Sequence, residues 1–115
     1  MRLRVLVVAA VLMWPVFALS QERTTGAFGT GNMLYETCGA HDIGNEKYCL
    51  AYAVGATDAF AWDGKVCPPR QVTEQQVRDI VVGYLRDHPE LRHYSAPSIA
   101  SRALEEAFPC KEQAH

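Results

Sequence analysis

Residues 66–110 read VCPPRQVTEQQVRDIVVGYLRDHPELRHYSAPSIASRALEEAFPC, and this stretch decides the fold. A cysteine stands at or near each end, and two segments with the period of an α-helix lie between the two cysteines. Pro89 separates the segments, because the residue before a proline is pushed out of helical backbone space. The stretch therefore predicts two helices that fold back on each other as a hairpin.

The first helix of the hairpin is predicted to begin at Thr73. Thr73 and Gln76 have the spacing of a capping box, in which each side chain bonds the backbone amide of the other residue. Apolar residues then recur at helical spacing and form one stripe that faces a core. This stripe consists of Val77, Ile80, Val81, Tyr84 and Leu85.

The second helix is predicted to begin at Ser95 and to end at Pro109. Pro97 is tolerated in its first turn, where the backbone amides have no helical partner to lose. One side of this helix is apolar, which predicts that it packs against the first. That side consists of Ala96, Ile99, Ala100, Ala103 and Ala107, with Leu104 and Phe108 beside them.

Residues 1–20 predict a signal peptide, because two arginines precede an apolar run that ends in a small-x-small cleavage site, Ala18-Leu19-Ser20. The run contains a proline and is shorter than the roughly 20 residues of a membrane-spanning helix. No cysteine lies at the cleavage site, so we expect no membrane anchor and a periplasmic location. Residues 21–31 predict a flexible leader. Residues 32–115 then form the helical domain.

The charge of the chain argues against a nucleic-acid partner. The 115 residues include 11 Lys and Arg against 13 Asp and Glu, a formal net charge of -2. Loss of Arg2 and Arg4 with the signal peptide leaves a domain of about 95 residues with a charge of about -4. Nucleic-acid binding requires a basic face that contacts the phosphates. A domain of this size has room for one small core.

Four cysteines in a small exported chain are typical of two disulfide bonds, for which composition alone leaves three pairings open. Chain order favours Cys38–Cys49, separated only by a turn, and Cys67–Cys110, just outside the two ends of the hairpin. The alternative is a zinc site that includes His41, but the spacings match no common zinc finger. We expect no metal ion and no cofactor.

Two further helices are predicted before the hairpin. Asn32 is placed to cap a short helix over residues 33–38, and a turn-rich connection follows at residues 39–45. Residues 46–62 are apolar almost all round, which indicates a helix that is central in the fold or covered by a partner. No segment alternates as a strand does, so the predicted class is all-α with four helices.

A ridge of small residues runs along the 46–62 helix, at Ala51, Gly55 and Ala59. Their spacing of four residues places them on one side of the helix, where another helix could approach closely. The ridge fits two interpretations. It packs inside the core of one molecule, or it forms the seam of a homodimer.

The chain resembles the Rap/Tai family of type VI secretion immunity proteins over residues 33–111. The runs that carry the resemblance are CLAYAVGATD at 49–58, VCPP at 66–69, DHPELRH at 87–93 and ALEEAFPC at 103–110. The resemblance implies a small exported helical domain, often a homodimer, that binds a peptidoglycan amidase injected by a neighbouring cell. The amidase is then blocked before it cuts the wall of the protein's own cell.

No catalytic site is predicted. Asp87, His88, Glu90 and His93 gather near the hairpin turn, but they do not form the His-Glu-x-x-His motif of metal enzymes. The plainer interpretation is that this run builds the turn, with Arg92 and His93 bonding nearby carbonyls or carboxylates. Other functions that fit a small helical, disulfide-bonded domain are a periplasmic chaperone of the acid-stress type and an envelope-assembly module.

The hairpin turn is the predicted partner-binding site. A wall amidase has a cleft for an extended peptide, so its inhibitor is expected to present a stiff, projecting loop, which loses little entropy on binding. Leu91 and Tyr94 are the expected anchors, with Arg92 beside them, since Tyr and Arg are enriched among residues that dominate binding energy. Alternatively, Leu91 and Tyr94 point inward and only fix the hairpin angle. The full predicted set is His88, Glu90, Leu91, Arg92, His93 and Tyr94.

Overall fold

The computed structural model describes residues 29–111, so the predicted signal peptide and residues 21–28 of the predicted leader lie outside the described residues. Within this range the chain is helical, and its β-structure is limited to an isolated bridge between Thr30 and Ser95. The predicted all-α class with four helices is confirmed. The elements are α1 (Gly31–Gly39), α2 (Ile43–Trp62), α3 (Glu74–Asp87), the 3₁₀ turn η1 (Pro89–Leu91) and α4 (Ala96–Ala107).

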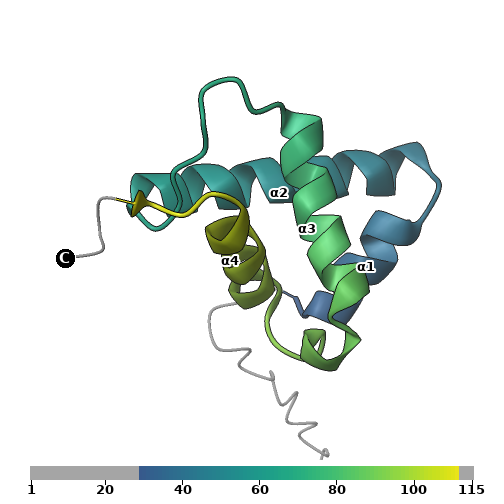
Figure 1. Cartoon of the computed structure of the whole chain (residues 1–115). Helices are drawn as coiled ribbons and strands as arrows, with labels where there is room; N and C mark the ends of the chain where they lie inside the picture. Colours follow the sequence, from purple (N-terminus) through teal and green to yellow (C-terminus); the bar gives the residue numbers. More distant parts are fainter. Residues whose placement is uncertain (1–28, 112–115) are drawn as a thin grey trace, which may run out of the picture.

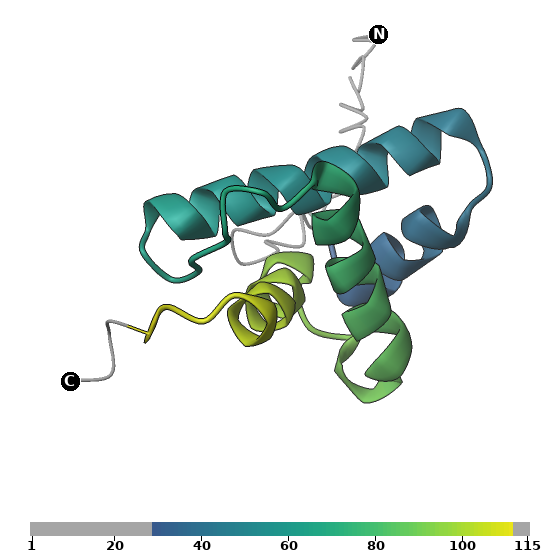
Figure 2. The same ribbon diagram turned by 45° about the horizontal axis from the view of Figure 1, so that its top comes forward.

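The longest helix, α2, runs across the molecule, and the other three helices pack against one side of it (Figure 1). Helix α3 crosses α2, with α1 and α4 on its two sides (Figure 2). Every pair of these four helices is in contact. The arrangement leaves the opposite side of α2 without a covering helix from the described part of the chain.

The hairpin of α3 and α4 forms as predicted. The Thr73 hydroxyl accepts a hydrogen bond from the Gln76 amide at 3.2 Å, and the Gln76 side chain accepts one from the Thr73 amide at 2.8 Å. These two bonds are the predicted capping box. Helix α3 ends at Asp87, and α4 begins at Ala96 with Pro97 in its first turn.

The core lies where the apolar faces of the helices meet. Leu34 of α1, Leu85 of α3 and Leu104 of α4 are fully buried, and the predicted stripe on α3 faces them. One predicted core residue differs. Ala107 is exposed, because it lies at the last turn of α4, where it lines a surface hollow between α3 and α4.

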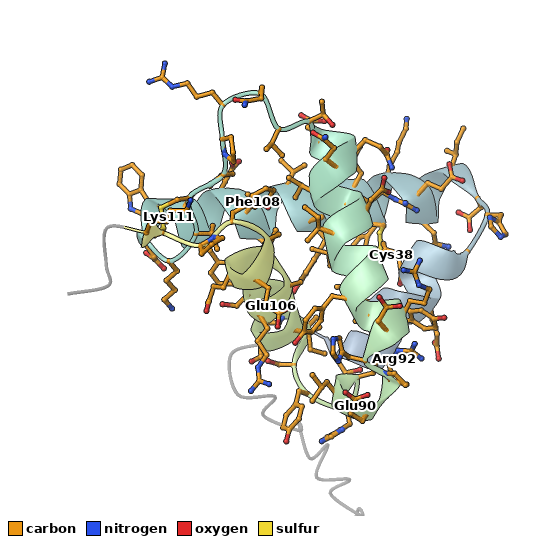
Figure 3. The ribbon with its side chains drawn as sticks, viewed as in Figure 1. Cys38, Glu90, Arg92, Glu106, Phe108 and Lys111 are labelled. Carbon is orange, nitrogen blue, oxygen red and sulfur yellow. A yellow bond between two sulfur atoms is a disulfide. The ribbon has the colours of Figure 1, made fainter. Side chains whose placement is uncertain are left out.

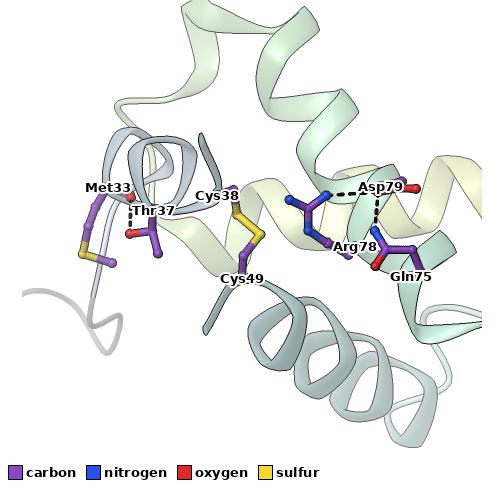
Figure 4. The surroundings of a disulfide bond; sticks show 7 residues. All are labelled: Met33, Thr37, Cys38, Cys49, Gln75, Arg78 and Asp79. Atoms are coloured by element: carbon purple, nitrogen blue, oxygen red, sulfur yellow. Dashed lines mark hydrogen bonds and ion pairs between the residues drawn. A yellow bond between two sulfur atoms is a disulfide. The ribbon is translucent and has the colours of Figure 1, made fainter. Parts of the chain in front are cut away.

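Both predicted disulfides are present. Cys38 at the end of α1 bonds Cys49 of α2 (Figure 4), and Cys67 bonds Cys110 beyond the end of α4. The second bond spans a sequence separation of 43 residues, which corresponds to about 4 kcal/mol in the chain-entropy model. Beside it, the Cys67 amide donates to the Phe108 carbonyl at 2.9 Å. The open end of the hairpin is therefore tied to the segment that follows α2.

Two helix starts differ from the predictions, and in each an earlier side chain caps the helix. Helix α1 begins at Gly31 with Thr30 as its cap, in place of the predicted cap Asn32. Helix α2 begins at Ile43 because Asp42 caps it, so the end of the predicted turn-rich connection is helical. Thr and Asp both cap helices well, so Thr30 and Asp42 set these two starts.

Candidate functional site

The loop at residues 88–95, between α3 and α4, contains every residue of the predicted partner-binding set. His88 leaves helical geometry, with φ -123° and ψ 63°, as expected for the residue before Pro89. The turn η1 follows, and the Tyr94 amide then donates to the Leu91 carbonyl at 3.0 Å. Two consecutive turns thus make a short loop with its own hydrogen bonds.

Arg92 holds this loop against the end of α3 (Figure 3). Its Nε donates to the Leu85 carbonyl at 2.6 Å, and its Nη2 donates to the Arg86 carbonyl at 3.1 Å. Carbonyls in the last turn of a helix have no helical donor, so Arg92 replaces one. The guanidinium also lies 3.6 Å from the ring centroid of Tyr35 in α1, a cation–π contact. The prediction that Arg92 bonds nearby carbonyls is confirmed, whereas His93, for which the same was predicted, contacts the Tyr94 ring.

Backbone hydrogen bonds tie the loop to the start of α1. The Asn32 amide donates to the Arg92 carbonyl at 2.8 Å, and the Gly31 amide donates to the Tyr94 carbonyl at 2.9 Å. A glycine is required at position 31, because a Cβ there would collide with the Ile99 side chain and lie 2.9 Å from the Arg92 carbonyl oxygen. The loop is therefore fixed from two sides, by α3 and by α1.

Glu90, His93 and Tyr94 of the loop are exposed, unlike Arg92. Tyr94 is 51% exposed, and its ring contacts that of His93 with centroids 4.1 Å apart. The His88 ring packs beside Tyr84 with centroids 4.2 Å apart, and its Nδ1 lies 3.1 Å from a Glu90 oxygen. Tyr94 is thus available to a partner, as the binding interpretation requires.

Leu91 is half-buried and lines a small hollow of about 110 Å³ on the side of the loop. The other walls are Tyr94 and three residues of α4, which are Ser98, Ile99 and Arg102. The half-buried position of Leu91 agrees in part with the alternative interpretation, in which its side chain helps to fix the hairpin angle. Sequence reasoning missed the contribution of α4 to this surface, since the hollow exists only once the hairpin has folded.

Two carboxyls of the loop region have lowered pKa values. The Arg86 side chain, 3.0 Å from Asp87, lowers the pKa of the Asp87 carboxyl. The pKa of Glu90 is lowered first by the hydrogen bond from its own backbone amide and then by the bond with His88. Both effects favour the charged form, so the loop presents negative charge beside its aromatic rings.

Within residues 29–111, no three His, Cys, Asp or Glu side chains lie close enough together to hold a metal ion. None of the helices in that range is long and apolar enough to cross a membrane.

The ridge at Ala51, Gly55 and Ala59 is exposed, on the side of α2 opposite its buried residues Cys49 and Ala53. The interpretation that the ridge packs inside the core of one molecule is therefore wrong. A Cβ at Gly55 would meet no atom within 4 Å, so the fold does not require a glycine there.

Two large apolar side chains continue this exposed side of α2. Tyr48 is 47% exposed and Trp62 is 91% exposed. Neither side chain belongs to the predicted ridge. Their signal was present, because each stands seven residues from Gly55, a spacing that keeps side chains on one side of a helix.

These features describe a small helical domain, stapled by two disulfides, with a rigid loop and an uncovered apolar helix face. The chain matches the family model of the Rap1a immunity proteins over residues 30–110, and it belongs to this family. The match spans all four helices and both disulfides. No curated protein and no solved structure matches the chain. Membership implies an immunity function against a secreted effector.

Proposed function

We propose that the chain is a periplasmic immunity protein that inhibits a peptidoglycan amidase delivered by a type VI secretion system. Membership of the Rap1a immunity proteins supports this function over the chaperone and envelope-assembly alternatives. Export is supported by the signal peptide predicted for residues 1–20 and by two disulfides, which persist in oxidising compartments.

The observation that carries the proposal is the fixed shape of the loop. Arg92 binds two carbonyls of α3, and the backbone of the loop is bonded to the start of α1. A segment that is already ordered loses little entropy when it enters a cleft, so this loop suits the blocking of an active site. Tyr94 and Leu91 are its contact residues in the proposal. Arg92 holds the loop against α3 and is not itself a contact residue in the proposal.

The test is inhibition of a peptidoglycan amidase encoded beside this chain's gene, with purified residues 21–115 as inhibitor. The double variant Leu91→Ala with Tyr94→Ala should weaken inhibition by about 2 kcal/mol, roughly thirtyfold, as expected for two central contact residues. Thermal melting of the variant checks that the fold is intact.

Ile43→Ala is the matched control, because Ile43 is 74% exposed at the start of α2, outside the loop. It should inhibit as well as the wild type. If the loop variant also inhibits at full strength while the wild type is active, the loop is a structural turn. If the wild type does not inhibit the amidase, the proposed function itself is rejected.

We also propose that the outer face of α2 forms a homodimer seam. Its residues are arranged symmetrically about Gly55: Ala51 and Ala59 lie four residues away on either side, and Tyr48 and Trp62 lie seven away. Two antiparallel copies of α2 related by a two-fold axis at Gly55 would pair Ala51 with Ala59 and Tyr48 with Trp62. Such a self-complementary patch is what a two-fold interface requires.

Trp62 reports on this seam, because the other tryptophan, Trp14, lies in the predicted signal peptide. In residues 21–115 its fluorescence should shift to the blue as concentration rises and the dimer buries it. Gly55→Leu should abolish the shift and sediment as a folded monomer. A dimer that persists in Gly55→Leu with only a lowered melting temperature would reject the seam.

A further inference from the structure

The outer side of the α3–α4 hairpin carries a groove that begins beside the loop. Three surface hollows make it up, and adjacent hollows share lining residues. Arg102 lines the first and the second, while Tyr84 and Glu106 line the second and the third. The third hollow is the largest, with a volume of about 420 Å³. We call this depression the α3–α4 groove; Figure 3 labels Glu106, which lines it from α4, and Glu90 and Arg92 in the loop.

The floor of the groove includes a glycine in the middle of α3. Gly83 lies beside Ile80 and Tyr84, with Ala103 from α4. A glycine inside a helix is destabilising relative to alanine. The fold does not need it, because a Cβ at Gly83 would meet only the Arg86 Nη2, at 3.6 Å. The absent side chain leaves space only on the outside of the hairpin, where another molecule could approach the backbone closely.

The rim of the groove is acidic. Asp79 and Asp87 each bond the arginine beside them in α3, whereas Glu106 makes no ion pair within the described residues. The titratable groups that line the two larger hollows, besides Tyr84, are Asp79, Asp87, His88, Arg102, Glu105 and Glu106. Arg78 and Arg86 pair with Asp79 and Asp87, so the acidic charge of the rim comes mainly from Glu105 and Glu106. Arg102 stands at the end nearest the loop.

We propose that the α3–α4 groove binds a positively charged, amphipathic segment of the effector, beside the site that the loop occupies. This inference rests on the proposed function and names a second contact surface for it. The apolar floor would receive the apolar side of the segment, Gly83 permits its close approach, and Glu106 attracts its charge. The groove is continuous with the loop through Tyr94 and Arg102, so one partner can contact both.

The sharpest test is to fill the groove without harming the helix. Gly83→Ala should raise the melting temperature by about 3–6 °C, because alanine favours helix more than glycine. Gly83→Leu, whose side chain occupies the groove, should keep the fold and weaken inhibition of the amidase about tenfold or more. If Gly83 had only a structural role, substitutions that keep or raise the stability of the fold would not weaken inhibition.

Gly39→Leu is the control, since it also replaces a helical glycine with leucine, at the exposed end of α1 outside the groove, where a Cβ would meet no atom within 4 Å. It should leave inhibition unchanged. If Gly83→Leu inhibits like the wild type while the Leu91 and Tyr94 variant does not, the groove is empty in the complex and the inference fails. The proposed function would then still stand.

The charge of the partner segment is tested separately. Glu106→Lys should slow association with the amidase about fivefold at low salt, and the difference should shrink at high salt as charges are screened. Glu36→Lys makes the same change on the exposed surface of α1 and should have a much smaller effect. If the two variants slowed association equally, the effect would come from the net charge of the protein and not from Glu106 in the groove. That result would overturn the inference.

A peptide-binding experiment without the amidase tests the groove even if the proposed function is wrong. An amphipathic leucine–lysine peptide is titrated into ¹⁵N-labelled residues 21–115. Amide shifts should concentrate along the groove residues of α3 and α4 and disappear in Gly83→Leu, and a leucine–glutamate peptide should cause none. Shifts spread over the whole surface, or shifts retained in Gly83→Leu, overturn the inference.

Discussion

The loop between α3 and α4 and the outer face of α2 are both exposed, and the chain builds them in opposite ways. The loop has little regular structure, yet Arg92 and the backbone bonds from Gly31 hold it to two helices. The outer face of α2 is regular helix, yet its largest side chain, Trp62, is 91% exposed. The first surface takes its shape from contacts within the chain, and the second takes its shape from the helix alone.

This difference matters for binding. A loop held by its own chain can enter a cleft with little loss of entropy, so it suits a projecting inhibitor. An exposed apolar helix face gains mainly from burial of apolar area, so it suits a partner of matching shape, such as a second copy. The glycines agree with this division. Gly31 is required by contacts inside the chain, whereas Gly55 meets no neighbouring atom.

The largest expected effect comes from removing the side chain that holds the loop. Arg92→Ala leaves the Leu85 and Arg86 carbonyls without their donor and removes the contact with Tyr35. The free energy of unfolding should fall by about 3 kcal/mol, the sum expected for two charge-assisted hydrogen bonds and one cation–π contact, discounted for partial exposure. Urea denaturation of residues 21–115 measures the change.

Two other variants sharpen this result. Arg92→Lys keeps the charge but not the planar fork, so it should recover less than half of the loss. Arg70→Ala removes an exposed arginine from the segment between α2 and α3 and should change stability by less than about 0.5 kcal/mol. If Arg92→Ala were as stable as Arg70→Ala, the loop would not depend on this side chain.

The next effect is smaller and concerns Gly31. Gly31→Ala places a methyl group against Ile99 and the Arg92 carbonyl oxygen, where the chain has no space. Overpacking of this kind costs roughly 1–3 kcal/mol. Because the strain falls on the contact between α1 and the loop, inhibition of the amidase should weaken together with stability. A neutral result in both measurements would show that the loop is free to move away from α1.

A glycine-to-alanine substitution in α2 should raise the free energy of unfolding, whereas the one at Gly31 lowers it. Gly55→Ala meets no neighbouring atom and replaces a glycine inside a helix, so the monomer should gain about 0.5–1 kcal/mol. Denaturation at a concentration low enough to keep the wild type monomeric measures this gain. If Gly55→Ala destabilised the monomer as Gly31→Ala does, the outer face of α2 would be in contact with the chain itself.

Local sequence signals were sufficient for most of the fold. The stripe from Val77 to Leu85, the capping box at Thr73 and the proline at position 89 each act within a few residues, so they could be recognised without a structure. The disulfide pairing followed from the order of the elements along the chain. In these cases the physical cause is local or topological.

The missed features depend on packing between distant segments. The cation–π contact of Arg92 is with Tyr35, which is far away in the sequence, and the α3–α4 groove exists only between two folded helices. Helix α2 is apolar almost all round, so its sequence could not show which side the other helices would cover. That choice left Ala51, Gly55 and Ala59 outside.

The smallest expected effect is on the pH dependence of stability. It should involve the loop and not the outer face of α2. Asp87 and Glu90 beside the loop have pKa values below their ordinary values, Asp87 because of Arg86 and Glu90 because of its own backbone amide and His88. A carboxyl whose pKa is lower in the folded state adds stability above its unfolded pKa and loses it as pH falls through the folded value. This contribution should therefore be constant from about pH 7 to 5 and decline below about pH 4.

Urea denaturation at three pH values, near 7, 5 and 3, tests this in the wild type and in Asp87→Asn with Glu90→Gln. The double variant should lose less stability between the two lower values than the wild type does. The residues of the α2 face are Tyr48, Ala51, Gly55, Ala59 and Trp62, a set without a carboxylate or a histidine, so the concentration dependence of Trp62 fluorescence should hardly change from about pH 7 to 5. An equal acid loss in both proteins would show that the loop carboxylates do not contribute. A dimer that dissociates between the two higher values would place a titrating group at the seam.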